Sequence, residues 1–126
     1  MAKNVFICGN PLVSNDSMPF RILEDLKKAL PKVVFFDFDP TENFPEDDPL
    51  YIIDTVVGIS GVKVIEDVDG FEDAPHFSLH DADLAFHLKM MKKLGKLPKI
   101  KIFGVPPEGD GSVILEDLVK KLKAIL

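Results

Sequence analysis

Three polar residues from distant parts of the sequence could together hold a metal ion. Asp16 lies in the loop after the first apolar run, and Asp54 directly follows the apolar run Tyr51–Ile53. His80 lies just before a predicted helix. Two carboxylates and one imidazole form an open site for a borderline divalent ion such as zinc or nickel. An imidazole at the amino end of a helix tends to stay neutral, which is the form that binds metals.

Each of these residues also has an ordinary structural interpretation. Asp16 can be a turn residue or a helix cap, Asp54 can cap the loop that follows it, and His80 can simply begin a helix. Their spacing matches no compact metal motif such as H-E-x-x-H. However, a carboxylate at the end of a buried strand is costly unless it is paired or bound to a cation. The metal-site hypothesis therefore requires that the fold bring the three side chains together.

The other histidines and the single cysteine are weaker candidates. His87 lies one turn from Leu84 and Met91 and is expected to flank the core-facing side of its helix. His76 falls in an acidic loop, where it could be an accessory contact. Cys8 has no second cysteine to pair with and lies in an apolar run, so we expect it to be part of the buried core.

Apolar runs and helical periodicity predict the elements that would position these residues. Short apolar runs predict five buried strands, at residues 4–8, 33–36, 51–53, 62–65 and 100–105. Apolar residues at helical spacing predict helices over 19–30 and 81–94 and from 111 or 112 to the end. Ser17 is a candidate cap for the first helix, and Gly95 is expected to end the second. The acidic stretches 39–49 and 66–77 are predicted loops.

The order of these elements predicts the fold class. Helices placed between apolar strands indicate an α/β fold, a three-layer α/β/α sandwich. The connection around Gly58–Gly61 is too short for a helical crossover, so we expect the third and fourth strands to be antiparallel. The sheet is therefore predicted to have five strands, mostly parallel, with one antiparallel strand. In such sheets ligands bind beyond the carboxyl ends of the parallel strands, where Asp16 and Asp54 follow their strands.

Length, composition and charge exclude several classes of protein. The chain has 126 residues, which predicts one domain spanning residues 1–126. A hydrophobic fraction of 46% and a charged fraction of 29% are typical of a folded soluble protein and not of a disordered chain. The net charge of −6 argues against nucleic acid as a partner, because an acidic surface repels phosphate backbones. No apolar run approaches the ~20 residues of a membrane helix, and no leader precedes the first strand, so we expect a cytoplasmic protein.

Four segments resemble motifs of the hydrogenase maturation endopeptidases. These proteases remove the C-terminal extension of a [NiFe]-hydrogenase large subunit after nickel insertion. The resemblance runs through nearly the whole chain. The matching segments are Gly9-Asn10 with Leu12 and Asn15-Asp16, Ile52-Ile53-Asp54, Ser78-Leu79-His80-Asp81, and Gly104-Val105-Pro106-Pro107.

The resemblance implies a function for the three polar residues. The family's metal-contacting residues correspond to Asp16, Asp54 and His80. The resemblance implies an aspartyl-type endopeptidase in which these three residues are catalytic and bind metal. They would hold the nickel carried by the precursor while the adjacent peptide bond is hydrolysed. Zinc or cadmium could replace nickel in vitro. A metal can polarise the scissile carbonyl, activate water or only position the substrate, and the sequence leaves these roles open. The implied partner is the precursor of a [NiFe]-hydrogenase large subunit, bound by a monomer.

Several positions depart from the family's pattern. Ile7 stands in place of the first glycine of Gly-x-Gly-Asn, Asn15 replaces an acid, and Ser17 and Pro19 replace glycines. Fewer glycines make the loop stiffer, so a non-catalytic relative that binds a metal or a partner is the alternative. A receiver-like domain phosphorylated on Asp54 fits less well, because the chain lacks the acidic pair after the first strand and the lysine after the fifth.

Overall fold

A single five-stranded sheet forms the centre of the protein. The computed structural model describes residues 3–8, 12, 17–37, 45–56, 58–66 and 79–126, and it describes only the backbone of 79–85. The strands run in the order β2-β1-β3-β5-β4. Their bounds are β1 (Lys3–Ile7), β2 (Val33–Asp37), β3 (Leu50–Thr55), β4 (Lys63–Ile65) and β5 (Ile100–Val105). All strand pairs are parallel except that of β4 with β5. The predicted five-stranded, mostly parallel sheet with one antiparallel strand is confirmed, but β2, predicted as a buried strand, lies at the edge of the sheet and has no buried residue.

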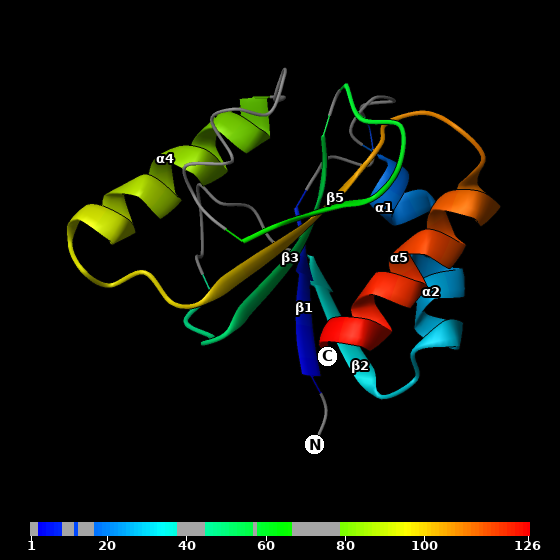
Figure 1. The fold of residues 1–126 in the computed structure, drawn as a ribbon, viewed down its shortest axis with the longest axis horizontal. Helices are drawn as coiled ribbons and strands as arrows, with labels where there is room; N and C mark the ends of the chain where they lie inside the picture. Colours follow the sequence, from blue (N-terminus) through cyan, green and yellow to red (C-terminus); the bar gives the residue numbers. More distant parts are fainter. Residues whose placement is uncertain (1–2, 9–11, 13–16, 38–44, 57, 67–78) are drawn as a thin grey trace.

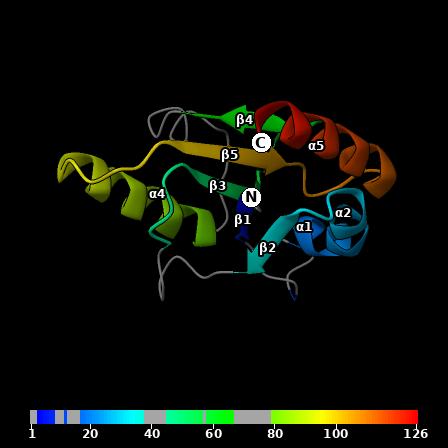
Figure 2. The ribbon, with the colours of Figure 1, turned by 90° about the horizontal axis from the view of Figure 1, so that it is seen from below.

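Helices cover both faces of this sheet. They are α1 (Met18–Arg21), α2 (Leu23–Ala29), α4 (Leu79–Lys93) and α5 (Gly111–Ile125). Figure 1 shows α4 on one face and α1, α2 and α5 on the other, and the view from below in Figure 2 shows the same three layers. The three-layer α/β/α prediction is therefore confirmed. None of the helices in the described ranges is long and apolar enough to cross a membrane.

The antiparallel strand has a different neighbour from the one predicted. β4 runs antiparallel, as expected, but it pairs with β5 and not with β3. All six residues of β3 are buried, which is typical of a central strand covered on both faces. Both edges of β3 are taken by the parallel strands β1 and β5, so β4 lies at the outer edge of the sheet.

The helix predicted over 19–30 is interrupted at one residue. Ile22 separates α1 from α2, with φ −100° and ψ −1°. Ser17 is the N-cap residue of α1, as predicted, but its side chain makes no capping hydrogen bond. Instead the Ser17 carbonyl accepts hydrogen bonds from the N–H groups of Phe20 and Arg21, both at 3.0 Å. The backbone, and not a side-chain cap, therefore begins this helix.

The other two predicted helices agree closely with the structure. α4 begins at Leu79, two residues before the predicted start, and ends before Gly95, whose φ of +70° is typical of a glycine that ends a helix. α5 begins at Gly111 and is capped by Asp110, which accepts a hydrogen bond from the Ser112 N–H at 2.9 Å. The loops predicted at 39–49 and 66–77 lie mostly outside the described residues.

The sheet separates two apolar clusters. Alternate strand residues point to opposite faces, and the two clusters follow this alternation. Ile7, Ile53 and Phe103 pack with α1, α2 and α5, whereas Cys8 and Ile52 pack on the face that also buries Leu88 of α4. Cys8 is fully buried, so its predicted place in the core is confirmed. Each strand residue can therefore be assigned to the α4 face or to the α5 face.

Asp117 links α5 to the turn before β4. The Val62 N–H donates a hydrogen bond to Asp117 Oδ2 at 3.1 Å, and Lys121, one turn further along α5, donates to Oδ1. These hydrogen bonds hold the pKa of Asp117 below its usual value, and the bond from Lys121 has the largest effect. The carboxylate form is therefore stabilised in the folded state.

We expect Asp117→Ala to lower the free energy of unfolding by about 1 kcal/mol or less at pH 7, because a half-exposed acceptor is lost. The folded pKa lies below the unfolded one, so this contribution is present above the unfolded pKa and is lost as the pH falls through the folded pKa. Urea unfolding of wild type and variant between pH 7 and pH 3 should show the difference shrinking below about pH 4. Glu116→Ala, at the exposed neighbouring position, is the matched control, and an equal loss in both variants would contradict the assignment.

Candidate functional site

Asp54 lies at the point of the sheet where the strand order reverses. β1 is flanked by β2 on one side and by β3 on the other, and β3 continues to β5. The chain thus leaves β1 in one direction, towards β2, while the strands that follow β3 lie in the other direction. Ligands of open α/β sheets bind outside the carboxyl ends of the strands at such a switch point. Asp54 is the residue before the last in β3, so it lies beside this point.

The Asp54 side chain belongs to the α4 face of the sheet. Ile52 packs in the cluster on this face, and strand alternation places Asp54 on the same side. Its side chain is fully buried, and Oδ1 accepts a hydrogen bond from the Thr55 N–H at 2.8 Å. The local bond agrees with the interpretation of Asp54 as a loop cap. Complete burial, however, goes beyond what a cap requires, because a carboxylate removed from water needs compensation.

Two neighbours of Asp54 were not predicted as site residues from the sequence. Gly104 of β5 lies directly beside Asp54 in the register of the sheet. A Cβ at Gly104 would lie 2.8 Å from Val56 Cγ2, so a larger residue would push the segment after β3 away. Thr55 lies on the opposite face, and its buried Oγ1 has no hydrogen-bond partner among the described residues. The signal for both was their position at a strand end, which the sequence shows only once the strands are paired.

Asp16 cannot be placed relative to Asp54. It lies outside the described residues, between Cys8 at the end of β1 and Ser17 before α1. The Cys8 N–H donates to the Ile53 carbonyl at 2.9 Å, so the chain leaves β1 directly beside the end of β3. The segment that carries Asp16 therefore starts at the same switch point.

The second residue of α4 is His80. Figure 1 shows that α4 begins on the side of the sheet where β1, β3 and β5 end. The backbone of His80 thus lies inside the first helical turn and on the same side of the sheet as Asp54, whose face α4 covers. Its side chain, and the whole of His76, lie outside what the structure describes.

The joint metal site therefore stays a prediction. Within the described part of the chain, no group of three or more His, Cys, Asp or Glu side chains could hold a metal ion. Of the three predicted ligands, only Asp54 has a described side chain. β3 ends and the loop after β1 starts at the switch point, and α4 begins on the same side of the sheet.

The loops after β1 and β5 are tied together beside this point. The guanidinium of Arg21, the chain's single arginine, donates a hydrogen bond to the carbonyl of Pro107 at 3.1 Å. Arg21 belongs to α1, which follows the segment containing Asp16, and Pro107 follows β5. This bond connects the two segments that lie on either side of the end of β3.

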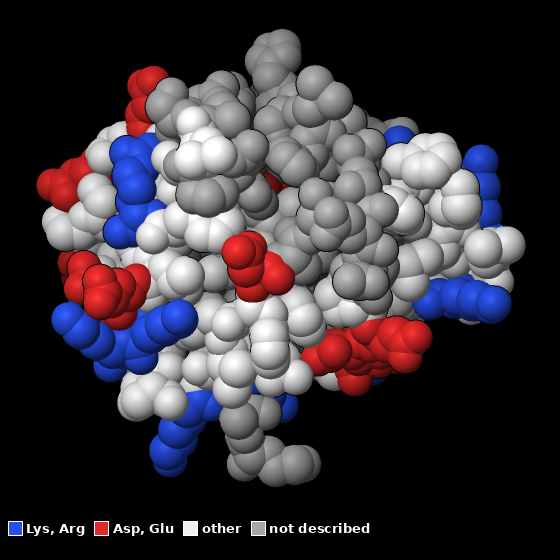
Figure 3. All heavy atoms as spheres, turned by 180° about the vertical axis from the view of Figure 1, so that it is seen from behind, with Lys and Arg blue, Asp and Glu red and all other residues white. Residues whose placement is uncertain are grey.

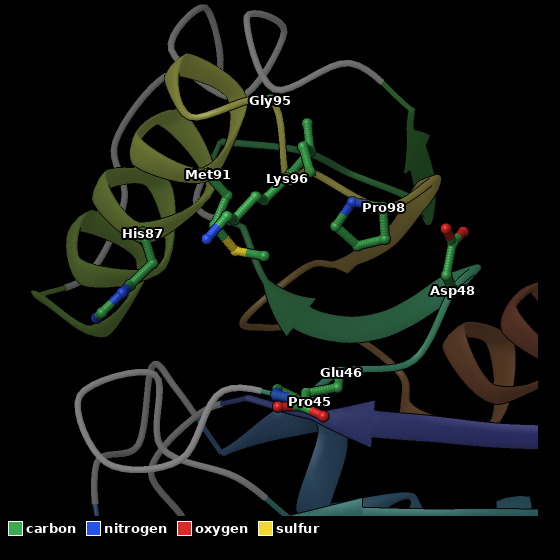
Figure 4. A pocket seen from close by; sticks show the side chains of 9 residues that line it. Pro45, Glu46, Asp48, His87, Met91, Gly95, Lys96 and Pro98 are labelled. Carbon is green, nitrogen blue, oxygen red and sulfur yellow. The ribbon is translucent and has the colours of Figure 1, made fainter.

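A pocket of about 570 Å³ lies away from the candidate site. Its lining comes from α4, from the segment before β3 and from the segment before β5: Pro45, Glu46, Asp48, His87, Met91, Gly95, Lys96, Leu97 and Pro98. Figure 4 shows His87 and Met91 of α4 on one side, with Asp48 and Pro98 on the other. Asp48 is held in place, since its Oδ1 accepts a hydrogen bond from the Lys99 N–H at 3.1 Å. Because these segments precede β3 and β5, the pocket lies at the opposite end of the strands from Asp54, about 13 Å along β3.

His87 is half-buried and lines this pocket, next to the fully buried Leu88. Its ring lies 6.2 Å from that of Phe86, at 78° to it. A position at the flank of the core-facing side of α4 was predicted, and the structure places it there.

No protein-family model and no curated protein matches the sequence. Solved structures match the fold. The hydrogenase-maturating endopeptidase HybD from E. coli is 21% identical with a TM-score of 0.63, and the match covers 98% of this chain and 90% of HybD. The hydrogenase 3 maturation protease is 17% identical with a TM-score of 0.63, over 98% of this chain and 88% of that protein.

A protein from Wolinella succinogenes described as uncharacterized is also similar, at 13% identity and a TM-score of 0.61, over 99% of this chain and 96% of the other. At such identities the likeness concerns the fold. Because the matches span nearly all of this chain, they include the sheet, the end of β3 and α4. The protein therefore has the α/β fold of the hydrogenase maturation endopeptidases.

Proposed function

We propose that this protein is a hydrogenase maturation endopeptidase. In this proposal it acts as a monomer in the cytoplasm on the precursor of a [NiFe]-hydrogenase large subunit and removes the C-terminal extension. Asp16, Asp54 and His80 hold the nickel that the precursor carries. The observation that supports it most directly is Asp54, a fully buried carboxylate at the switch point of a sheet whose fold is that of the maturation endopeptidases.

The chemistry follows from the ligand types. Two carboxylates and a neutral imidazole suit a borderline ion such as nickel and leave coordination positions open for the precursor's own ligands. Nickel is part of the substrate here, so a precursor without nickel lacks the feature that these residues recognise. Asp16, Asp54 and His80 would hold this nickel at the end of β3. The ion would then position the adjacent peptide bond, and it could also polarise the carbonyl or activate water.

Incubation with a nickel-loaded large-subunit precursor from the source organism tests the proposal. We expect the mass of the precursor to fall by that of its C-terminal extension, as measured by mass spectrometry. The same precursor prepared without nickel should stay intact, because the recognition feature is missing. Tight binding of the nickel-loaded precursor without any change of mass would contradict protease activity and favour the non-catalytic alternative.

A further inference from the structure

The segment 86–101 differs in charge from the rest of the chain. It contains six lysines and no Asp or Glu, although the whole chain has a net charge of −6. One of them, Lys101, forms a salt bridge with Glu66 at 3.0 Å. The others lie on the second half of α4 and on the segment between α4 and β5. A concentration of one charge on a chain of the opposite net charge points to a partner of complementary charge.

The same part of α4 exposes a row of apolar side chains. Phe86, Met90 and Leu94 are four residues apart, so they lie above one another on one face of the helix. Their exposed fractions are 60%, 44% and 64%. Leu94 follows the last residue of α4, but its N–H still donates to the Met90 carbonyl at 3.0 Å, so the row is continuous. Leu88, in contrast, is fully buried against the sheet, and the row therefore faces away from the core.

Lysines border this row. Lys93 and Lys96 are exposed and Lys89 is half-exposed. Figure 3 shows lysines on both sides of an uncharged surface at the end of the molecule that α4 forms. Single exposed apolar residues are ordinary on protein surfaces, but three in a row with lysines beside them are not scattered. We call Phe86, Met90 and Leu94 with Lys89, Lys93 and Lys96 the α4 surface.

We propose that the α4 surface docks the body of the hydrogenase precursor, through an apolar patch on the precursor that is bordered by carboxylates. This inference rests on the proposed function. A fully apolar partner would offer no carboxylates to Lys93 and Lys96 at the interface, whereas a carboxylate border complements these two lysines and steers association. Clusters of exposed aromatic and flexible apolar side chains are the usual anchors of such interfaces.

The position of the α4 surface fits this role. At 1.5 Å per residue, the row begins about 9 Å and ends about 21 Å from His80 along the helix. A protein docked there keeps its carboxyl-terminal segment within reach of the end of β3. The 570 Å³ pocket on the neighbouring side of the same helix, lined by Met91 and Lys96, can receive an anchoring side chain. A bilayer surface fits less well, because the inner side of α4 is used for the core and leaves only a narrow apolar row.

Two paired variants test the docking. Phe86→Ser with Leu94→Ser removes the apolar anchors, and Lys93→Glu with Lys96→Glu reverses the border. For each we expect the Kd for the nickel-loaded precursor, measured by calorimetry, to rise at least about tenfold. The lysine variant should also lose most of the salt dependence of binding. At saturating precursor, both variants should process at the wild-type kcat, because the α4 surface does not touch the scissile bond. The weaker docking should appear as a higher KM.

The matched control lies on the opposite face of the protein. Val113→Ser and Lys123→Glu make the same kinds of change at exposed positions of α5 and should leave Kd and KM unchanged. If the charge reversals impair folding, Lys93→Gln with Lys96→Gln removes the charges more gently and should still raise Kd.

The outcomes separate the docking from the proposed function. If wild type cuts the precursor and the α4 variants have unchanged Kd and KM, the docking is overturned and the proposed function stands. If wild type binds the precursor without cutting it and the α4 variants bind it more weakly, the docking is supported and protease activity is contradicted. Two further measurements would assign the surface to another occupant and overturn the proposal. One is binding of wild type, but not of the variants, to vesicles of phosphatidylglycerol. The other is a dimer in sedimentation that the variants lose.

Discussion

Replacing Asp54 by asparagine should abolish nickel binding and precursor processing while leaving the fold intact. Asparagine has the same shape, and its oxygen can still accept the hydrogen bond from the Thr55 N–H. It lacks the negative charge that a metal ligand supplies. Even partners outside the coordination shell contribute ten- to a hundredfold to metal affinity, so we expect a loss of at least about a hundredfold. Calorimetry with nickel ions and the mass of the incubated precursor measure the two effects.

The thermal stability of the same variant distinguishes a metal ligand from a structural residue. Asparagine fills the same buried space and keeps the bond from the Thr55 N–H, so the variant should unfold at a temperature close to that of wild type. Nickel should raise the unfolding temperature of wild type only, because only a bound ligand stabilises the folded state. His80 lies in α4 and not in β3, and His80→Ala should show the same loss of nickel binding. An Asp54→Asn protein with unchanged nickel affinity and a much lower unfolding temperature would show that Asp54 is purely structural.

Replacing Leu88 by alanine should weaken both the fold and the candidate site. Leu88 is the fully buried residue by which the described side chains of α4 pack against the sheet, in one cluster with Ile52 and Ile102. Truncating such a side chain leaves a cavity and costs about 2–5 kcal/mol in the free energy of unfolding. Because α4 also carries His80, a looser helix should reduce nickel affinity under conditions where the protein is still folded.

Leu118→Ala provides the comparison for this variant. Leu118 is equally buried, but it belongs to α5 on the opposite face of the sheet. Urea unfolding should show a similar loss of stability in both variants, whereas calorimetry should show weaker nickel binding for Leu88→Ala alone. Equal nickel affinities in the two variants would mean that the packing of α4 does not position His80.

The local pattern of the sequence was sufficient for most of the architecture. Continuous apolar runs predicted the five strands, because a strand covered on both faces is mostly apolar, as β3 is from Leu50 to Ile53. Helical spacing of apolar residues predicted α5, in which Ile114, Leu118 and Leu122 are buried. Gly95 ended α4 as predicted, since its backbone conformation has a positive φ. These features depend on neighbouring residues and on burial, which a single sequence records.

Strand pairing and side-chain neighbours required the tertiary structure. The short connection after β3 correctly predicted an antiparallel strand, but the partner of β4 is β5, because β3 already has parallel strands on both edges. The interruption at Ile22 likewise has no signal in the spacing of its apolar neighbours. Pairing is a choice among distant segments, and several choices bury the same apolar runs equally well.

For the candidate site, the sequence by itself determined which residue types lie at which element ends: an aspartate at the end of β3, an aspartate after β1 and a histidine at the start of a helix. The tertiary structure decided that β1 and β3 are neighbours at the switch point, that Asp54 is fully buried on the face covered by α4, and that Gly104 lies beside it. The reason is physical. The type of a residue sets its chemistry, whereas the distance between residues far apart in the chain is set by how the whole sheet assembles.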